Sequence, residues 1–224
     1  MSKKINEEQM ATLLDYLYEK ALDGIPAVSK SVDELVDDYM KQDENPEKAA
    51  VAFINNQIAK CGLSGFLSGL GGLLVLPIAV PANVGSVLYV QLRMIAVIAK
   101  MGGFDVRSDQ VQTLVYACLT GSAIADVLKQ AGIEVGEKFA IAAINKIPGK
   151  VLISINKKVG FRLLTKFGEK GVVNFVKLVP LTGGLIGWVV DISSTKIIAK
   201  NAYTLFIKNQ IPYYETEVES EQLV

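Results

Sequence analysis

The chain has 224 residues, of which 50% are hydrophobic and 21% charged, with a mean hydropathy of +0.34 and no formal net charge. This length and apolar content suit one folded domain and exclude wholesale disorder. The absence of histidine excludes Ser-His-Asp and Cys-His catalysis and His-ligated metal sites, and two cysteines are too few for a Cys-only structural zinc site.

The first part of the chain predicts two short amphipathic helices. Hydrophobic residues recur at helical spacing over residues 5–22, and the run Gly24-Ile25-Pro26 ends that helix. Ser31 is suited to cap a second helix, with Glu34 at the capping-box position. We assign residues 1–45 to an acidic N-terminal helical region.

A long uncharged segment follows the third predicted helix, which begins at Pro46 with Asn45 as its cap. Residues 61–92 contain no charged side chain, and uncharged apolar stretches longer than about 18 residues are typical of membrane spans. However, this segment is rich in glycine and contains Pro77 and Pro81, which disfavour a straight helix.

We therefore expect a bent helical hairpin, with arms over residues 62–76 and 83–101, and Gly102 as the C′ residue that caps the second arm. Two placements of this hairpin remain open. It is either buried in the core of the protein or inserted into one leaflet of a bilayer.

The rest of the chain also predicts helices, and the pattern contains little evidence for strands. A second uncharged stretch at residues 178–190 is too short to cross a bilayer. The predicted fold class is an all-α multi-helix bundle with the Gly/Pro-bent hairpin near its centre, and we expect residues 212–224 to form a disordered acidic tail. Helices are predicted at 108–128, 134–147, 150–167, 169–177 and 185–208.

Charge is strongly segregated along the sequence. Residues 1–48 have a net charge of −6, residues 137–210 of +9, and residues 211–224 of −4. Such segregation indicates a partner for each pole. Either the acidic N-terminal helices pack against the basic half, or the basic half binds an external anion.

A basic stretch dominates the helix predicted at 150–167 and extends beyond it. Lys158, Arg162, Lys166 and Lys170 are each four residues apart and form one stripe of a helix. A basic amphipathic helix is typical of proteins that bind the surface of an anionic membrane. The predicted headgroup contacts are Lys150, Lys157, Lys158, Arg162, Lys166 and Lys170.

The central part of the chain resembles the EcsC family of bacterial proteins. The resemblance begins in the glycine-rich turn and continues through a helix of the type Q-L-R-x-I-x-x-I-A that ends in Gly-x-Asp. It covers about residues 47–208, so residues 46–211 are expected to form an EcsC-like helical domain. The positions that carry it are Gly72, Pro77, Pro81, Asn83, Gln91, Arg93, Gly102, Asp105 and Asp191.

One position departs from the family pattern, because Asn83 stands where the family has aspartate. A helix cap would tolerate this change, whereas a catalytic carboxylate would be lost. The family has no settled reaction, and some members are linked to ABC exporters or to membranes. The resemblance therefore implies a helical protein near a membrane rather than a particular activity.

No motif in the sequence predicts an enzyme. Acidic residues in the apolar half, such as Asp105, Asp126 and Asp191, would serve catalysis only if they met in one pocket. No phosphate-binding loop or dinucleotide fingerprint is present, and aromatic residues are not interleaved with the lysines as nucleic-acid binding requires. We expect no catalytic residue, no cofactor, no metal and no nucleic acid. Cys61 and Cys118 are expected to be buried thiols.

The leading hypothesis is a non-enzymatic protein that binds the cytoplasmic face of the inner membrane, since the N-terminus has no signal-peptide pattern. Its partners would be anionic lipid or another membrane protein. The alternatives are a soluble module that holds a lipid or other apolar ligand in an internal cavity and, third, a carboxylate-based hydrolase. The predicted apolar contacts to membrane or ligand are Phe66, Leu70, Leu73, Leu74, Leu76, Ile78 and Trp188.

Overall fold

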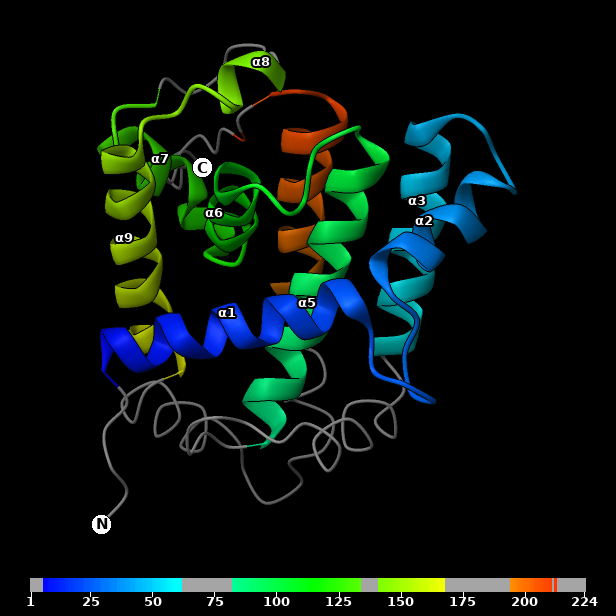
Figure 1. Cartoon of the computed structure of the whole chain (residues 1–224), viewed down its shortest axis with the longest axis horizontal. Coiled ribbons are helices and arrows are strands. Elements are labelled where there is room, and N and C mark those ends of the chain that lie inside the picture. Colours follow the sequence, from blue (N-terminus) through cyan, green and yellow to red (C-terminus); the bar gives the residue numbers. More distant parts are fainter. Residues whose placement is uncertain (1–5, 62–81, 134–140, 168–193, 211, 213–224) are drawn as a thin grey trace, which may run out of the picture.

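The computed structural model describes residues 6–61, 82–133, 141–167, 194–210 and 212, and these residues form an all-α bundle (Figure 1). No β-strand is formed by these described residues, and Ile25 and Ser29 form an isolated β-bridge. The predicted fold class is confirmed. The helices are α1 (Glu7–Asp23), α2 (Val32–Met40), α3 (Pro46–Cys61), α5 (Ala82–Met101), α6 (Asp109–Cys118), α7 (Ile124–Gln130), α8 (Ile141–Ile144) and α9 (Gly149–Phe167).

Several helix boundaries follow the predicted capping residues. Asn45 accepts hydrogen bonds from two backbone N–H groups of the first turn of α3, and Ser108 accepts one from α6. At α2, Ser31 and Glu34 form the predicted capping box. Each cap satisfies N–H groups that have no partner inside the helix. Gly24 ends α1 in the left-handed region, with φ of 77°, as the sequence predicts.

Helix α5 occupies the centre of the bundle. Helices α1, α2, α3 and α6 all pack against it, and α1 crosses it at a steep angle in Figure 1. The window Val84–Met101 has the length and hydropathy of a membrane span, and most of its residues are buried inside the protein. The second arm of the predicted hairpin is therefore buried in the core of the protein in this structure, which is one of the two placements that the sequence left open. The first arm, 62–76, lies outside the described residues.

The acidic N-terminal region shares one hydrophobic core with the rest of the described chain. Leu13 and Leu17 of α1, Leu35 of α2 and Leu92 of α5 belong to the same buried cluster as Ile155 of α9. The N-terminal helices are thus part of the bundle rather than an appendage.

Helix α5 ends at Met101 as predicted, but the predicted C′ residue, Gly102, is wrong. Gly103, with φ of 85°, is the left-handed residue after the helix, and Phe104 N–H donates to the carbonyl of Ala99 as in a Schellman motif. Gly102 has another function, because a Cβ atom there would lie 2.1 Å from the carbonyl oxygen of Phe206. The glycine allows two backbones to approach closely.

The single helix predicted over 108–128 is also wrong, because it is divided into α6, a 3₁₀ turn at Gly121–Ala123 and α7. Gly121 has φ of 64°, which an α-helix does not accommodate. The prediction of 134–147 is only partly tested, since α8 covers four residues and 134–140 lie outside the description. Of the helix predicted at 185–208, residues 194–202 are α-helical and Tyr203–Ile207 form a π-helix.

Candidate functional site

Helix α9 lies at one side of the bundle and carries most of the described part of the predicted basic stretch (Figure 1). Its sequence contains five Lys and Arg residues and no Asp or Glu. The apolar residues Leu152, Ile155, Val159 and Leu163 recur at helical spacing and are buried, and α9 packs against α1, α6 and α7. This packing fixes which side chains of α9 face solvent.

The solvent-facing side of α9 combines cations with two large apolar side chains. Ile153 is 71% exposed and Phe161 is 61% exposed, while Lys150 and Lys157 are also exposed. These four positions are spaced three or four residues apart and therefore lie along one face. We call Lys150, Ile153, Lys157 and Phe161 the outer face of α9. The lysines of this face were predicted as contacts from the sequence, but Ile153 and Phe161 were not. Their helical positions, which differ from those of the buried apolar residues, were the signal that could have identified them.

The predicted stripe of Lys158, Arg162 and Lys166 lies on a different side of the helix. These three residues line a groove of about 610 Å³ between α9, the end of α7 and the start of α1. Val127 contributes apolar lining, and Phe161 lies at the boundary between the groove and the outer face. The basic side chains of α9 are thus divided between two neighbouring surfaces.

Lys158 has a defined internal partner. Its Nζ donates a 2.9 Å hydrogen bond to the backbone carbonyl of Gln130, the last residue of α7. A cation at a helix C-terminus stabilises carbonyls that have no partner inside the helix. Lys158 therefore has a structural function, and any contact with a lipid headgroup would use its other N–H donors.

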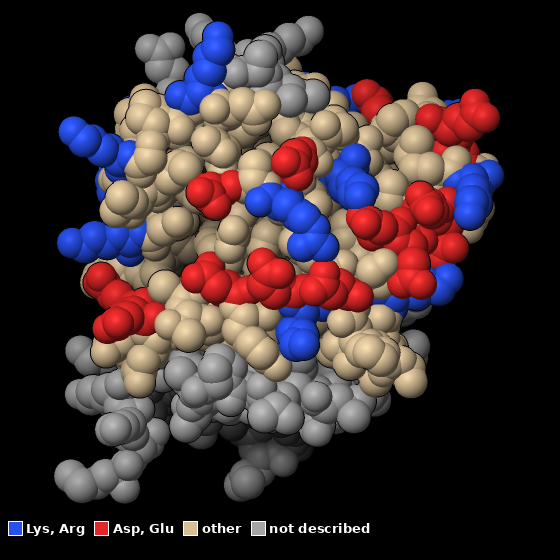
Figure 2. Space-filling model, in the orientation of Figure 1, with Lys and Arg blue, Asp and Glu red and all other residues tan. Residues whose placement is uncertain are grey.

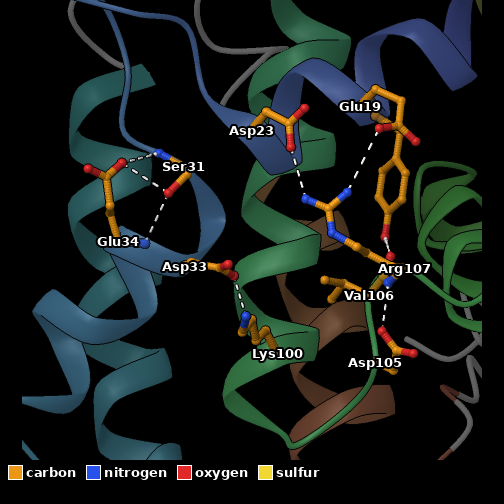
Figure 3. Close-up of polar contacts among 10 residues, drawn as sticks. Glu19, Asp23, Ser31, Asp33, Glu34, Lys100, Asp105, Val106 and Arg107 are labelled. Carbon is orange, nitrogen blue, oxygen red and sulfur yellow. Dashed lines mark hydrogen bonds and ion pairs between the residues drawn. The ribbon is translucent and has the colours of Figure 1, made fainter.

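The acidic helices find most of their cationic partners away from α9. Arg107, which follows α5, bonds to Asp23 at 2.9 Å and lies 4.0 Å from Glu19 (Figure 3). Lys100 at the end of α5 pairs with Asp33. These carboxylates hold the pKa of the Arg107 guanidinium above its ordinary value, first through the hydrogen bond that Arg107 donates to Asp23.

Three cations of α9 have no ion-pair partner among the described residues. Lys208 pairs with Glu47, but no ion pair among the described residues involves Lys150, Lys157 or Arg162. In Figure 2 a row of acidic side chains crosses the front over α1, and basic side chains project at the edge where α9 lies. Of the two open interpretations, internal pairing with the acidic N-terminal helices applies to Lys208 and not to Lys150, Lys157 or Arg162 within the described residues.

The described residues that carry the family resemblance, such as Gln91, Arg93 and Asp105, occupy core and turn positions. Gln91 is buried and its side-chain amide donates to Thr195 Oγ1 at 3.2 Å, which joins α5 to the last helix. Arg93 is also buried, with its guanidinium 5.6 Å from the centre of the Tyr89 ring. Asp105 accepts a hydrogen bond from the backbone N–H of Arg107 in the turn after α5. These described positions hold the fold together.

The two described acidic residues that were considered for catalysis lie on different elements. Asp105 lies in the α5–α6 turn and Asp126 is exposed in the first turn of α7. Among the described residues no group of three Asp, Glu or Cys side chains is placed to hold a metal ion. Cys118 is buried as predicted, and burial raises the pKa of its thiol.

Several predicted contacts lie outside the described residues, so the structure does not test them. The side chains of Cys61 and Asn83 are also outside the description, although Asn83 itself falls in the first turn of α5. The remaining untested positions are Phe66, Leu70, Gly72, Leu73, Leu74, Leu76, Pro77, Ile78, Pro81, Lys170, Trp188 and Asp191.

Comparisons of the chain with models of known protein families, with curated proteins and with solved structures find no match.

Proposed function

We propose that this protein is a peripheral membrane protein that binds anionic lipid surfaces through the outer face of α9. The observation that carries the proposal is the exposure of Ile153 and Phe161 on the same face as Lys150 and Lys157, on a helix without acidic residues. Helices that lie in the membrane interface combine apolar side chains with flanking Lys and Arg in this way.

The two kinds of side chain supply different contributions to binding. Each exposed cation near an anionic surface contributes about 1 kcal/mol, which salt weakens. Burial of Ile153 and Phe161 in the interface adds a contribution that salt does not weaken, of about 1.5–3 kcal/mol for each fully buried side chain. Together these terms predict reversible binding rather than permanent insertion.

Membership of the EcsC family and a place on the cytoplasmic side of the inner membrane belong to the same proposal. They are supported by the resemblance over residues 47–208. Another membrane protein remains an alternative partner for the outer face. The alternative function, an internal cavity for an apolar ligand, stays a prediction, since most of its expected lining lies outside the described residues.

Vesicle co-sedimentation tests the proposal. The wild-type protein should bind phosphatidylglycerol-containing vesicles and not pure phosphatidylcholine, with binding that falls as salt rises. The double variant Ile153→Ser with Phe161→Ser should lose most of the binding without loss of fold by circular dichroism. Val51→Ser is the matched control, because Val51 is 45% exposed on α3, away from α9. No binding to anionic vesicles, or equal binding to neutral ones, would overturn the proposal.

A further inference from the structure

We propose that the groove between α9, α7 and the start of α1 is a site for a lipid phosphomonoester, the headgroup class of phosphatidic acid. This inference rests on the proposed function, since it adds selectivity for one headgroup to membrane binding by the outer face. The groove is a different surface of α9 from the outer face. Lys158, Arg162 and Lys166 line only the groove, and Lys157 and Phe161 belong to both surfaces.

The charge of the groove indicates an anionic ligand. Four cationic side chains line it, and Glu7 is the carboxylate among its described lining residues. Glu7 lies in the exposed first turn of α1, while Lys157, Lys158, Arg162 and Lys166 all come from α9. The excess of cations over carboxylates among these described lining residues favours an anionic ligand.

One of these cations is fixed in place before any ligand binds. The hydrogen bond from Lys158 Nζ to the Gln130 carbonyl uses one of its three N–H donors. The other two donors are then held near a constant position, so less side-chain entropy is lost when they bind an anion. Arg162 adds a planar guanidinium that can bind two phosphate oxygens at once.

A phosphomonoester matches this arrangement better than a phosphodiester. It carries a charge of about −1.5 to −2 at neutral pH and presents three terminal oxygens. A phosphodiester such as the one in phosphatidylglycerol has a single charge and two free oxygens. The cluster of cations should therefore discriminate between the two lipids even when the vesicles have the same surface potential.

The position of Phe161 indicates a lipid rather than a soluble phosphate. Its ring lines the groove and is also 61% exposed on the outer face, so it connects the cationic groove to the membrane-facing surface. A lipid whose headgroup enters the groove would leave its acyl chains beside Phe161 and Val127. The groove volume of about 610 Å³ is in the range of ligand sites in proteins.

The test compares phosphatidylcholine vesicles that carry phosphatidic acid with vesicles that carry phosphatidylglycerol, adjusted to the same zeta potential. Wild-type protein should bind the phosphatidic acid vesicles about fivefold more tightly, the factor that corresponds to about 1 kcal/mol. The double variant Arg162→Gln with Lys166→Gln should lose this preference and still bind both vesicles. Lys129→Gln with Lys146→Gln is the control of equal charge, since both lysines are exposed outside the groove lining, and it should keep the preference.

Two results would overturn the inference. One is equal binding of wild-type protein to the two vesicles at matched surface potential, or a preference that survives in the Arg162 and Lys166 variant. The other is binding of inorganic phosphate, in the absence of vesicles, as tight as the binding of phosphatidic acid vesicles, which would identify free phosphate as the ligand. Failure of the proposed function is distinguishable, because the wild-type protein would then bind neither kind of anionic vesicle.

Discussion

The carbonyl oxygen of Phe206 lies against the backbone of Gly102, at a place that a side chain on residue 102 would occupy. The contact joins the end of α5 to the π-helix Tyr203–Ile207, and Phe206 also makes an edge contact with Phe104 at 5.2 Å between ring centres. A glycine within the resemblance to the EcsC family thus has a packing function in this chain.

Gly102→Ala should destabilise the protein by about 1–3 kcal/mol, because the backbone of the π-helix must move to accept a Cβ atom. Gly160→Ala is the matched comparison, since Gly160 lies within α9 and a Cβ there meets nothing within 4 Å. It should stabilise the protein by about 0.5–1 kcal/mol through helix propensity. Urea denaturation measures both changes, and equal effects of the two variants would contradict the packing interpretation.

Tyr18 should make the protein sensitive to alkaline pH. Its hydroxyl donates to the carbonyl of Val106 at 2.7 Å, and burial, followed by the charge of Glu19, raises the pKa of its phenol above the ordinary value of 10.0. Below pH 10 the phenol is protonated in both folded and unfolded chains. Above pH 10 the unfolded chain ionises and the folded chain does not, so the free energy of unfolding falls as pH rises.

Tyr18→Phe tests this linkage. At pH 7 the variant should lose about 1 kcal/mol, because the Val106 carbonyl loses its donor. Above pH 10 the free energy of unfolding of the variant should fall less steeply than that of the wild type. The difference between the two slopes should be about 1.4 kcal/mol per pH unit. Tyr116, whose phenol pKa is also raised chiefly by burial, should continue to cause alkaline destabilisation in the variant. Parallel pH profiles of the two proteins would rule out the assignment to Tyr18.

Neighbouring lysines on α9 should differ in their effects on stability. Lys158→Met removes the hydrogen bond to the end of α7 and should lower the free energy of unfolding by about 1 kcal/mol. Lys157→Met should stay within about 0.5 kcal/mol of the wild type, because Lys157 is exposed on the outer face. The measurement is chemical denaturation at neutral pH. A larger loss for Lys157→Met than for Lys158→Met would exclude a capping function for Lys158.

Asn201 should be needed to hold the last helix against the break between α6 and α7. Its side chain is fully buried, and Nδ2 donates to the carbonyl of Gly121 at 2.8 Å. Asn201→Ala should cost about 1–3 kcal/mol, because a buried carbonyl loses its donor. Asn156→Ala on the exposed side of α9 is the control and should be nearly neutral. A negligible change in the thermal midpoint of Asn201→Ala would contradict the prediction.

Local signals in the sequence predicted the helices with clear caps. Ser31 with Glu34, Asn45 and Ser108 identified three helix starts, because a capping side chain bonds to backbone groups only two or three residues away. The division of 108–128 was missed, since the left-handed conformation of Gly121 is accompanied by a contact with Asn201, 80 residues later. The role of Gly102 was misassigned for the same reason, as Phe206 is distant in sequence.

The candidate site was predicted in part. The lysines of α9 were identifiable because a basic run without acids is a property of composition. Their division into an outer face and a groove was not, because it depends on where α7 and α1 pack against α9. The exposure of Phe161 required the same information, since an aromatic residue in an apolar helix is expected to be buried.

The sequence alone determined the helical class, the capped helix starts and the separation of acidic from basic segments, because each depends on neighbours along the chain or on composition. Only the tertiary structure decided that α5 is a buried core helix, that Arg107 and Lys100 engage the N-terminal acids, and that the outer face of α9 has no such partner among the described residues. Burial and ion pairing depend on contacts between residues far apart in the sequence, and packing alone establishes those contacts.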